Sequence, residues 1–347
     1  MNEEYYYSYL GTLPSGRIKQ QTYFQIREGL EALSPSFPVP KQEGSALSEI
    51  FTLVALDHPE IFYAPTFTCS FYPQAEVMEL KPQYLFKKKE IQDHQKAIQS
   101  RIQKLIRPAM ELDEAGREQY VHDFICRNVR YDKLKKAYSH EIIGPLTQGV
   151  GVCEGIAKTV KVLCGALKLP CIIAFCHNDP DKGIKYRHAW NLVRLNGKYY
   201  HLDATFDNTL SAGGDIRYDY YNTDDASLFR DHEPLVWPVP TCPERSQYYY
   251  IRQKLSFTKP EDLRSRAAQA VKKGKELTFH WRGGYLTREA LQMLCALLEE
   301  EARKKEKTAR ISLNWPQAVF RVTFTAIESG GEAAGVRMED ANEGERT

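Results

Sequence analysis

The spacing of apolar side chains predicts helices separated by short strands. The clearest helical pattern follows Cys153, where apolar residues recur at steps of one, three and four, the spacing of one buried helix face: Ile156, Val160, Leu163, Cys164 and Leu167. Similar patterns predict helices over residues 17–33, 46–56, 87–106, 117–128, 260–272 and 287–305. Strand-like runs lie between them, at 67–72, 77–85, 170–176, 276–281, around 311 and at 319–327. The chain is therefore expected to be an α+β protein.

Two further strand-like runs, rich in β-branched and aromatic residues, are joined by Asn-Gly at positions 196 and 197. Asn-Gly favours a type I′ hairpin turn, because both central residues of that turn need a positive φ. The resulting register places Trp190 opposite Asp203 and His188 opposite Thr205. His188 and Asp203 then lie diagonally on one face, close enough for the carboxylate to hold the imidazole.

Cys153 stands between glycines directly before the helical run. The backbone N–H groups at a helix N-terminus stabilise a thiolate, and they lower a cysteine pKa from about 8.5 to roughly 3.5–7.5. The alternative is an ordinary buried cysteine, since free cysteine is among the most buried residue types. With His188 and Asp203, however, Cys153 completes a nucleophilic triad of thiolate, general acid/base and orienting carboxylate.

Two other residues are candidates for the walls of this site. The amide of Gln148 would complete an oxyanion hole with the Cys153 backbone N–H, or Gln148 is an ordinary polar loop residue. Trp190 would shield the His–Asp bond from water or line the acyl groove, or it only packs in the core. A metal cluster is the weaker interpretation for His177, His188, His201 and Asp203. No cysteine pair supports a metal site, and a triad explains Cys153, His188 and Asp203 at once. Neither a metal nor another cofactor is expected.

Three blocks resemble, in their usual order, the signature blocks of the transglutaminase-like superfamily. They are Gly-Val-Cys-Glu-Gly at 151–155, His-Ala-Trp-Asn at 188–191 and Tyr-Tyr-His-Leu-Asp-Ala-Thr-Phe-Asp at 199–207. The stretch 220–232 also resembles the segment after this domain in bacterial cytoplasmic members. The resemblance implies a papain/transglutaminase-like core, in which a helix bearing the cysteine packs on an antiparallel sheet bearing the histidine and aspartate.

The same resemblance implies a thiol-dependent acyl-transfer enzyme that acts on protein or peptide amide bonds through a Cys153 thioester. The superfamily includes proteases, amidases, cross-linking enzymes and inactive members. Hydrolysis by a cysteine protease or amidase is favoured over transglutaminase cross-linking, because water is always present and no motif reveals a dry amine site. The alternative is a catalytically inactive member that acts as a binding or scaffold module.

Length and composition predict several folded units. With 347 residues, of which 42% are hydrophobic and 12% aromatic, the chain has enough apolar material for two or three domains. We expect an N-terminal α+β domain over 1–110, the catalytic domain over 111–245 and a C-terminal α+β domain over 246–328. The tail over 329–347 is rich in Gly and Glu and is expected to be disordered.

Charge and cysteine usage narrow the expected partners. The chain has 47 basic and 45 acidic residues, a net charge of +2, so neither nucleic acid nor an anionic membrane is an expected partner. The eight cysteines show no paired spacing typical of zinc sites or disulfide scaffolds. A signal-peptide pattern and an apolar run of about 18 residues are both missing, so a cytoplasmic location is expected. The expected partner is a protein or peptide substrate; these residues do not specify an oligomeric state.

Overall fold

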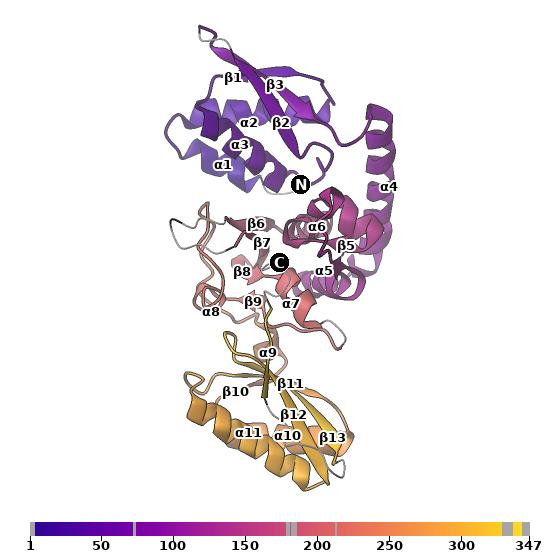
Figure 1. The fold of residues 1–347 in the computed structure, drawn as a ribbon, viewed down its shortest axis with the longest axis vertical. Coiled ribbons are helices and arrows are strands. Elements are labelled where there is room, and N and C mark those ends of the chain that lie inside the picture. The colour runs from indigo at the N-terminus through magenta and orange to yellow at the C-terminus, as the bar shows by residue number, and fades with distance from the viewer. Residues whose placement is uncertain are drawn as a thin grey trace.

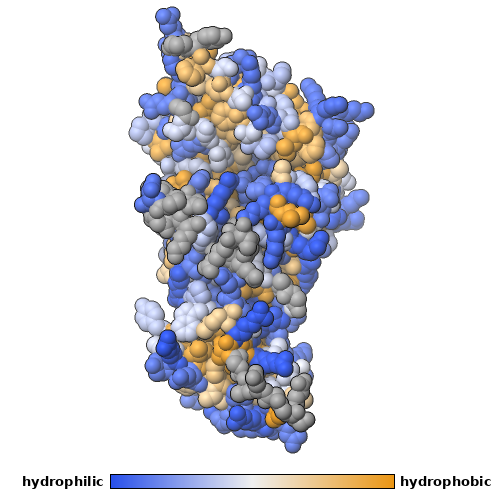
Figure 2. All heavy atoms as spheres, viewed as in Figure 1, coloured by the Kyte–Doolittle hydropathy of each residue, from blue (hydrophilic) through white to orange (hydrophobic). Residues whose placement is uncertain are grey.

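The computed structural model describes residues 4–71, 74–177, 181, 186–211, 214–327 and 336–341. Figure 1 shows an elongated molecule in which three groups of elements follow one another along the long axis. Figure 2 shows hydrophilic residues over much of the visible face, with hydrophobic residues in small groups between them. Among the described residues, no helix combines the length and the apolar character needed to cross a bilayer.

The N-terminal group packs helices against a three-stranded antiparallel sheet. Its helices are α1 (Tyr5–Gly11), α2 (Gly16–Glu31) and α3 (Gly44–Asp57), and its strands are β1 (Phe37–Pro40), β2 (Thr66–Phe71) and β3 (Val77–Gln83), in the order β1-β3-β2. Proline is unfavourable in a strand because it has no N–H to donate to a neighbouring strand. The prolines of β1 are tolerated because β1 lies at the edge of the sheet. Helix α4 (Lys88–Ile106) leads from this group to the central one (Figure 1).

The central group is built on one helix and one antiparallel sheet. Helix α6 (Cys153–Ala166) packs on the sheet β6-β7-β8-β9, whose strands are β6 (Cys171–Cys176), β7 (His188–Leu195), β8 (Lys198–Leu202) and β9 (Tyr221–Thr223). Helices α5 (Glu114–Asn128) and α7 (Ala204–Ser211) pack against α6. Every residue of β6 is buried, as in a strand that is covered on both faces. The predicted fold class is confirmed.

The long connection between α5 and α6 contains short elements of its own. These are β4 (Arg130–Tyr131), the 3₁₀ turn η2 (Ala137–His140), the π-helical turn η3 (Gly144–Gln148) and β5 (Val150–Gly151), with β5 parallel to β4. The short pairing of β4 with β5 brings the chain to the start of α6, so this connection places Cys153.

The hairpin has the predicted turn but a shorter ladder. Asn196 and Gly197 have φ values of 50° and 81°, and Leu195 faces Lys198 as predicted. Pairing ends at Asn191 and Leu202, and the next residues begin α7. The two predicted pairs beyond this point, Trp190–Asp203 and His188–Thr205, are therefore not formed. Asp203 leaves the ladder, donates its N–H to the Tyr220 carbonyl at 3.0 Å and starts a helix.

The C-terminal group consists of helices and a five-stranded sheet, reached through the short helices α8 (Asp225–Leu228) and α9 (Tyr249–Arg252). The sheet order is β10-β11-β13-β12-β14, with β10 (Ser256–Phe257), β11 (Leu277–Trp281), β12 (Lys307–Asn314), β13 (Val319–Ala326) and β14 (Val336–Met338). Helices α10 (Pro260–Lys273) and α11 (Arg288–Arg303) pack against each other, and α11 also packs against β12.

The tail contains one strand that contradicts its predicted disorder. Residues 336–338 form β14, which pairs in parallel with β12. Beyond it, the Glu339 carboxylate lies 2.6 Å from the Arg217 guanidinium of the central group. Residues 336–339 are therefore ordered by backbone pairing at a sheet edge and by one ion pair. Their few apolar side chains gave no reason to predict a folded segment. The remaining residues of the predicted tail, apart from 339–341, lie outside the described part of the chain.

Buried side chains form two apolar clusters. The first joins the N-terminal and central groups, and the second lies within the C-terminal group. The junction in the first cluster is also polar: buried Asp57 accepts hydrogen bonds from the backbone of Tyr6 at 2.9 Å and the hydroxyl of Tyr23 at 3.0 Å, and lies 3.5 Å from Lys161 of α6. The N-terminal group thus packs against the central group and contacts α6, the helix that begins with Cys153.

Candidate active site

Cys153 is the first residue of α6 and is 7% exposed. The residue before it, Val152, is extended, and its N–H donates to the Ser139 carbonyl at 3.0 Å. At Gly155 any Cβ would overlap that same carbonyl group, so only glycine allows the first turn of α6 to lie against η2. The thiol thus stands at a helix N-terminus, where the unpaired N–H groups favour a thiolate.

A chain of charges crosses the start of α6. Glu154 lies 2.7 Å from Arg187 and 3.0 Å from Lys158, and Lys158 lies 2.7 Å from Glu141. Burial by itself would lower the pKa of Lys158, but the two carboxylates raise it to about 12. The Glu154–Arg187 pair joins the residue after Cys153 to the residue before His188.

His188 and Asp203 form a buried hydrogen-bonded pair. The distance from His188 Nε2 to Asp203 Oδ2 is 2.6 Å, and neither side chain is exposed. The other carboxylate oxygen accepts the N–H groups of Thr205 at 2.9 Å and Phe206 at 3.0 Å, so Asp203 caps α7. Burial opposes ionisation, yet His188 and His232 hold the pKa of Asp203 below its usual range.

A second thiol, that of Cys176, lies on the strand next to His188. Cys176 pairs with His188 across β6 and β7. Burial raises the pKa of the Cys176 thiol to about 11, while the charge of His188 lowers it and that of Cys153 raises it further. The Cys176 thiol is therefore a neighbour of the predicted base, on the strand beside it.

Trp190 and Phe206 cover the imidazole of His188. Their rings stack on it with centroid distances of 5.8 Å and 4.6 Å. The indole N–H of Trp190 donates to Nδ1 of His201 at 3.1 Å, and Nε2 of His201 lies 2.8 Å from Asp225. Because an indole can only donate, His201 is the neutral tautomer with its proton on Nε2. His201 therefore supports Trp190, and its own carboxylate partner is Asp225.

Gln148 lies at the end of η3 and is exposed. Its amide nitrogen lies 3.4 Å from the Thr147 hydroxyl. Within the described residues, no hydrogen bond joins Gln148 to His188 or Asp203. Its role in an oxyanion hole stays a prediction.

One residue that the sequence patterns did not single out, His232, lies at the centre of the site. Its Nε2 is 2.9 Å from Asp203 Oδ2, and its Nδ1 is 3.1 Å from Asp231 Oδ1. Burial would lower the pKa of His232, but the two carboxylates raise it. The sequence pointed to this region through the resemblance over residues 220–232. That resemblance does not assign a role to His232.

The four residues of the predicted metal cluster do not form one site. His188 and Asp203 group with His232, whereas His201 groups with Asp225 and Cys242. In the first group, the nitrogen–oxygen distances of 2.6 Å and 2.9 Å are those of direct hydrogen bonds. Ligands at about 2.0–2.1 Å around a tetrahedral zinc would lie farther from one another. The arrangement fits proton exchange better than metal binding.

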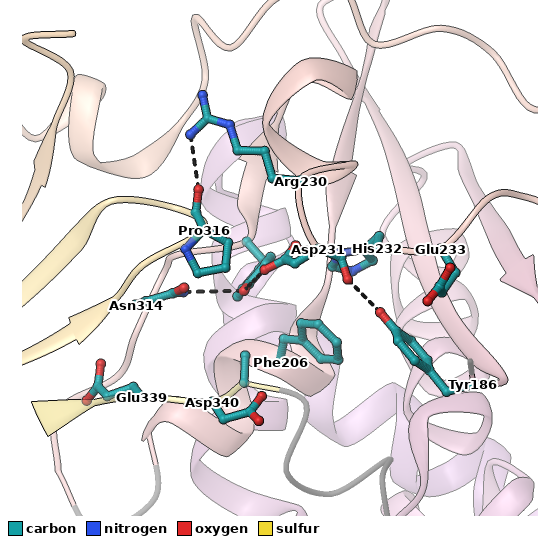
Figure 3. A pocket seen from close by; sticks show the side chains of 12 residues that line it. Tyr186, Phe206, Arg230, Asp231, His232, Glu233, Asn314, Pro316, Glu339 and Asp340 are labelled. Atoms are coloured by element: carbon teal, nitrogen blue, oxygen red, sulfur yellow. Dashed lines mark hydrogen bonds and ion pairs between the residues drawn. The ribbon is translucent and has the colours of Figure 1, made fainter. Parts of the chain in front are cut away.

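A cavity of about 350 Å³ lies beside His232, between the central and C-terminal groups (Figure 3). The hydroxyl of Tyr186 donates to the Asp231 carbonyl at 2.6 Å, and Arg230 donates to the Pro316 carbonyl at 3.1 Å. The C-terminal group contributes Asn314, Pro316 and residues 339–341 to the lining. The site is thus backed by residues from both groups.

Comparison with known proteins assigns the central group to a known class. Residues 103–204 match the model of the Transglutaminase-like superfamily. The resemblance seen in the sequence is confirmed over these residues: they are similar to the transglutaminase-like superfamily, whose members are typically cysteine-dependent enzymes. No curated protein matches the chain.

Two solved structures share limited similarity with the chain. A transglutaminase ("TGase") has 11% sequence identity and a TM-score of 0.28, with 49% of this chain and 50% of that chain covered. A candidate cysteine protease from Cytophaga hutchinsonii has 13% identity and a TM-score of 0.26, with 40% of this chain and 61% of that chain covered. The chain therefore spans about half to three fifths of the length of these proteins.

Proposed function

We propose that the protein is a thiol-dependent acyl-transfer enzyme that acts on protein or peptide amide bonds and hydrolyses them. The observation that carries the proposal is the buried hydrogen bond from His188 to Asp203, adjacent to the helix that begins with Cys153. In this assignment Cys153 is the nucleophile, His188 is the general acid and base, and Asp203 holds the imidazole in one tautomer.

The ring geometry of His188 supports one path for the proton in this proposal. Because His188 Nε2 donates to the carboxylate, Nδ1 is the nitrogen that takes the proton of the Cys153 thiol. The thiolate attacks the amide carbon, the C–S bond forms, and the C–N bond breaks as Nδ1 protonates the leaving amine. Water then attacks the thioester while His188 takes one of its protons. The C–S bond breaks, His188 passes that proton to the sulfur, and the acid is released from the Cys153 thiol. Proton and electron counts balance over the two half-reactions.

One observation favours the second candidate, a binding module without activity. The side chains of Cys153 and His188 are almost entirely buried, and the Glu154–Arg187 ion pair spans the residues next to them. A nucleophile must meet a carbonyl carbon, so the proposed enzyme needs this region to open. A scaffold protein that kept the residues for packing alone does not need such opening.

Iodoacetamide labelling followed by peptide mass spectrometry separates the two candidates without a known substrate. For the enzyme, Cys153 reacts at pH 6 faster than the more exposed Cys69 and Cys295, because only an activated cysteine is a thiolate at that pH. His188→Gln abolishes this preference. The matched variant His201→Gln, which removes the other buried histidine of the hairpin, causes a much smaller loss. Faster labelling of Cys69 and Cys295 than of Cys153 refutes the enzyme.

A peptide-amide library then tests the outcome of the reaction. With water as acceptor, the two products together weigh one water molecule more than the substrate, and the acyl product is a free acid. In the presence of methylamine, a transferase instead yields a methylamide. We expect the hydrolytic product to dominate at millimolar methylamine, and a dominant methylamide would reassign the chain to cross-linking chemistry.

A further inference from the structure

The carboxylate of Asp203 is shared between two histidines. Its Oδ2 lies 2.6 Å from Nε2 of His188 and 2.9 Å from Nε2 of His232, while Oδ1 accepts two backbone N–H groups of α7. A carboxylate oxygen only accepts, so both Nε2 atoms carry hydrogens. Both carboxylate oxygens of Asp203 therefore accept two hydrogen bonds each. The predicted triad accounts for the one from His188, and His232 donates the second hydrogen bond to Oδ2.

The second nitrogen of His232 meets another carboxylate. Nδ1 lies 3.1 Å from Asp231 Oδ1, and the other oxygen of Asp231 accepts the hydroxyl of Tyr220 at 2.5 Å. The amide of Gln317 also lies 3.3 Å from Asp231. Both oxygens of Asp231 thus accept hydrogen bonds, and the His232 nitrogen that faces Oδ1 is a donor and carries a hydrogen as well. His232 is thus an imidazolium between two carboxylates.

We propose that His232 is a positioning residue of the active site, a buried imidazolium that keeps Asp203 ionised and oriented toward His188. This inference rests on the proposed function. The charges support it: two carboxylates and one imidazolium leave one negative charge, which is balanced when His188 takes the thiol proton. The cluster therefore favours the protonated base at the moment when Cys153 becomes a thiolate.

The surroundings strengthen these bonds by excluding water. Rings of Phe206, Trp190 and Tyr220 lie 4.7 Å, 5.0 Å and 5.5 Å from the His232 ring. Hydrogen bonds in such an apolar enclosure are stronger than in water. The other charged and titratable groups on this side line the cavity: Tyr186, Arg230, Glu233, Glu339 and Asp340.

A purely structural histidine predicts a different result on substitution. If His232 only fills space among aromatic rings, His232→Phe keeps that packing and leaves the chemistry unchanged. If it positions Asp203, the phenyl ring removes a donor from a buried carboxylate, and Asp203 loses its fixed orientation. The glutamine variant tests the same point from the other side, because its amide N–H₂ can still donate to Asp203.

The test measures the rate of Cys153 alkylation by iodoacetamide against pH in the full chain, together with kcat and KM on a cleaved peptide. We expect His232→Phe to lower the alkylation rate at pH 7 and kcat by about 10- to 100-fold, the equivalent of one hydrogen bond to a charged group. KM stays within about threefold, because a positioning residue acts on the reacting groups through Asp203. His232→Gln recovers most of the loss. The control His280→Phe removes a buried histidine that contacts Ser256 in the C-terminal group, and leaves the rates unchanged.

Imidazole nitrogen NMR of the unmodified protein keeps the inference testable if a variant fails to fold. We expect both ring nitrogens of His232 to be protonated at pH 7, with a titration midpoint above the usual value near 6.5. A neutral His232 at pH 7, or a folded His232→Phe protein with the rate and pH profile of the parent, overturns the inference. Failure of the proposed function is recognised separately, because Cys153 of the parent protein would then react no faster than Cys69.

Discussion

Replacement of Asp203 by asparagine isolates the role of the charge at this position. The asparagine side chain has the same shape but offers one acceptor oxygen and one N–H₂ group. With the oxygen on the amides of Thr205 and Phe206, the cap of α7 is kept and the N–H₂ group faces the two Nε2 atoms. His188 must then carry its proton on Nδ1, where it cannot accept the proton of a thiol.

The expected magnitudes differ sharply between activity and stability. An asparagine that imposes the wrong tautomer costs about 10⁴-fold in kcat in a serine protease triad, or about 5.5 kcal/mol. The free energy of unfolding changes less, because two charge-assisted bonds become neutral or are lost, at about 1 kcal/mol each. In a chain of 347 residues, a loss of about 2 kcal/mol lowers Tm by roughly 3 °C. The variant is therefore folded and nearly inactive.

The assay combines kcat on a cleaved peptide, the pH profile of Cys153 alkylation and a thermal melt. Asp207→Asn is the matched control: Asp207 lies on the same helix, is also buried, and contacts His122 at 3.0 Å. Its pKa is raised by burial to about 7, so its neutral isostere disturbs little at neutral pH. If Asp203→Asn retains more than about a tenth of kcat, or if Asp207→Asn loses as much, the assigned role of Asp203 is refuted.

Two further predictions concern stability, measured by urea unfolding. Lys158→Met leaves Glu141 buried without its cation and lowers the free energy of unfolding by about 3–5 kcal/mol. Arg187→Ala changes a half-exposed side chain and alters the free energy of unfolding by less than about 1 kcal/mol. Equal losses in the two variants contradict the assigned burial. Burial raises the pKa of Glu118 to about 7, so its stabilising contribution is full below about pH 4.3 and is lost as pH rises through 7. Glu118→Gln therefore raises stability at pH 8 by up to about 3 kcal/mol and leaves it unchanged at pH 4; a uniform shift at both pH values would contradict this assignment.

Local chemistry in the sequence was sufficient for most elements and for part of the site. The apolar spacing after Cys153 predicts α6, and Asn-Gly at 196 and 197 predicts the turn and the register next to it. Both signals depend on a few neighbouring residues, so they can be interpreted without knowledge of the rest of the chain. The face shared by His188 and Trp190 follows from strand periodicity alone, because alternate side chains of a strand point the same way.

The sequence predicted His188 as a partner of Asp203, but only the tertiary structure decided its other partners. The hairpin ladder stops before this residue because the backbone turns into α7, and its carboxylate becomes a helix cap as well as a partner of His188. His232 follows in sequence by 29 positions and reaches Asp203 only through the packing of the chain after β9. No periodicity connects residues that meet through a fold. The sequence therefore determined which elements form, while long-range packing determined which buried charges share a proton.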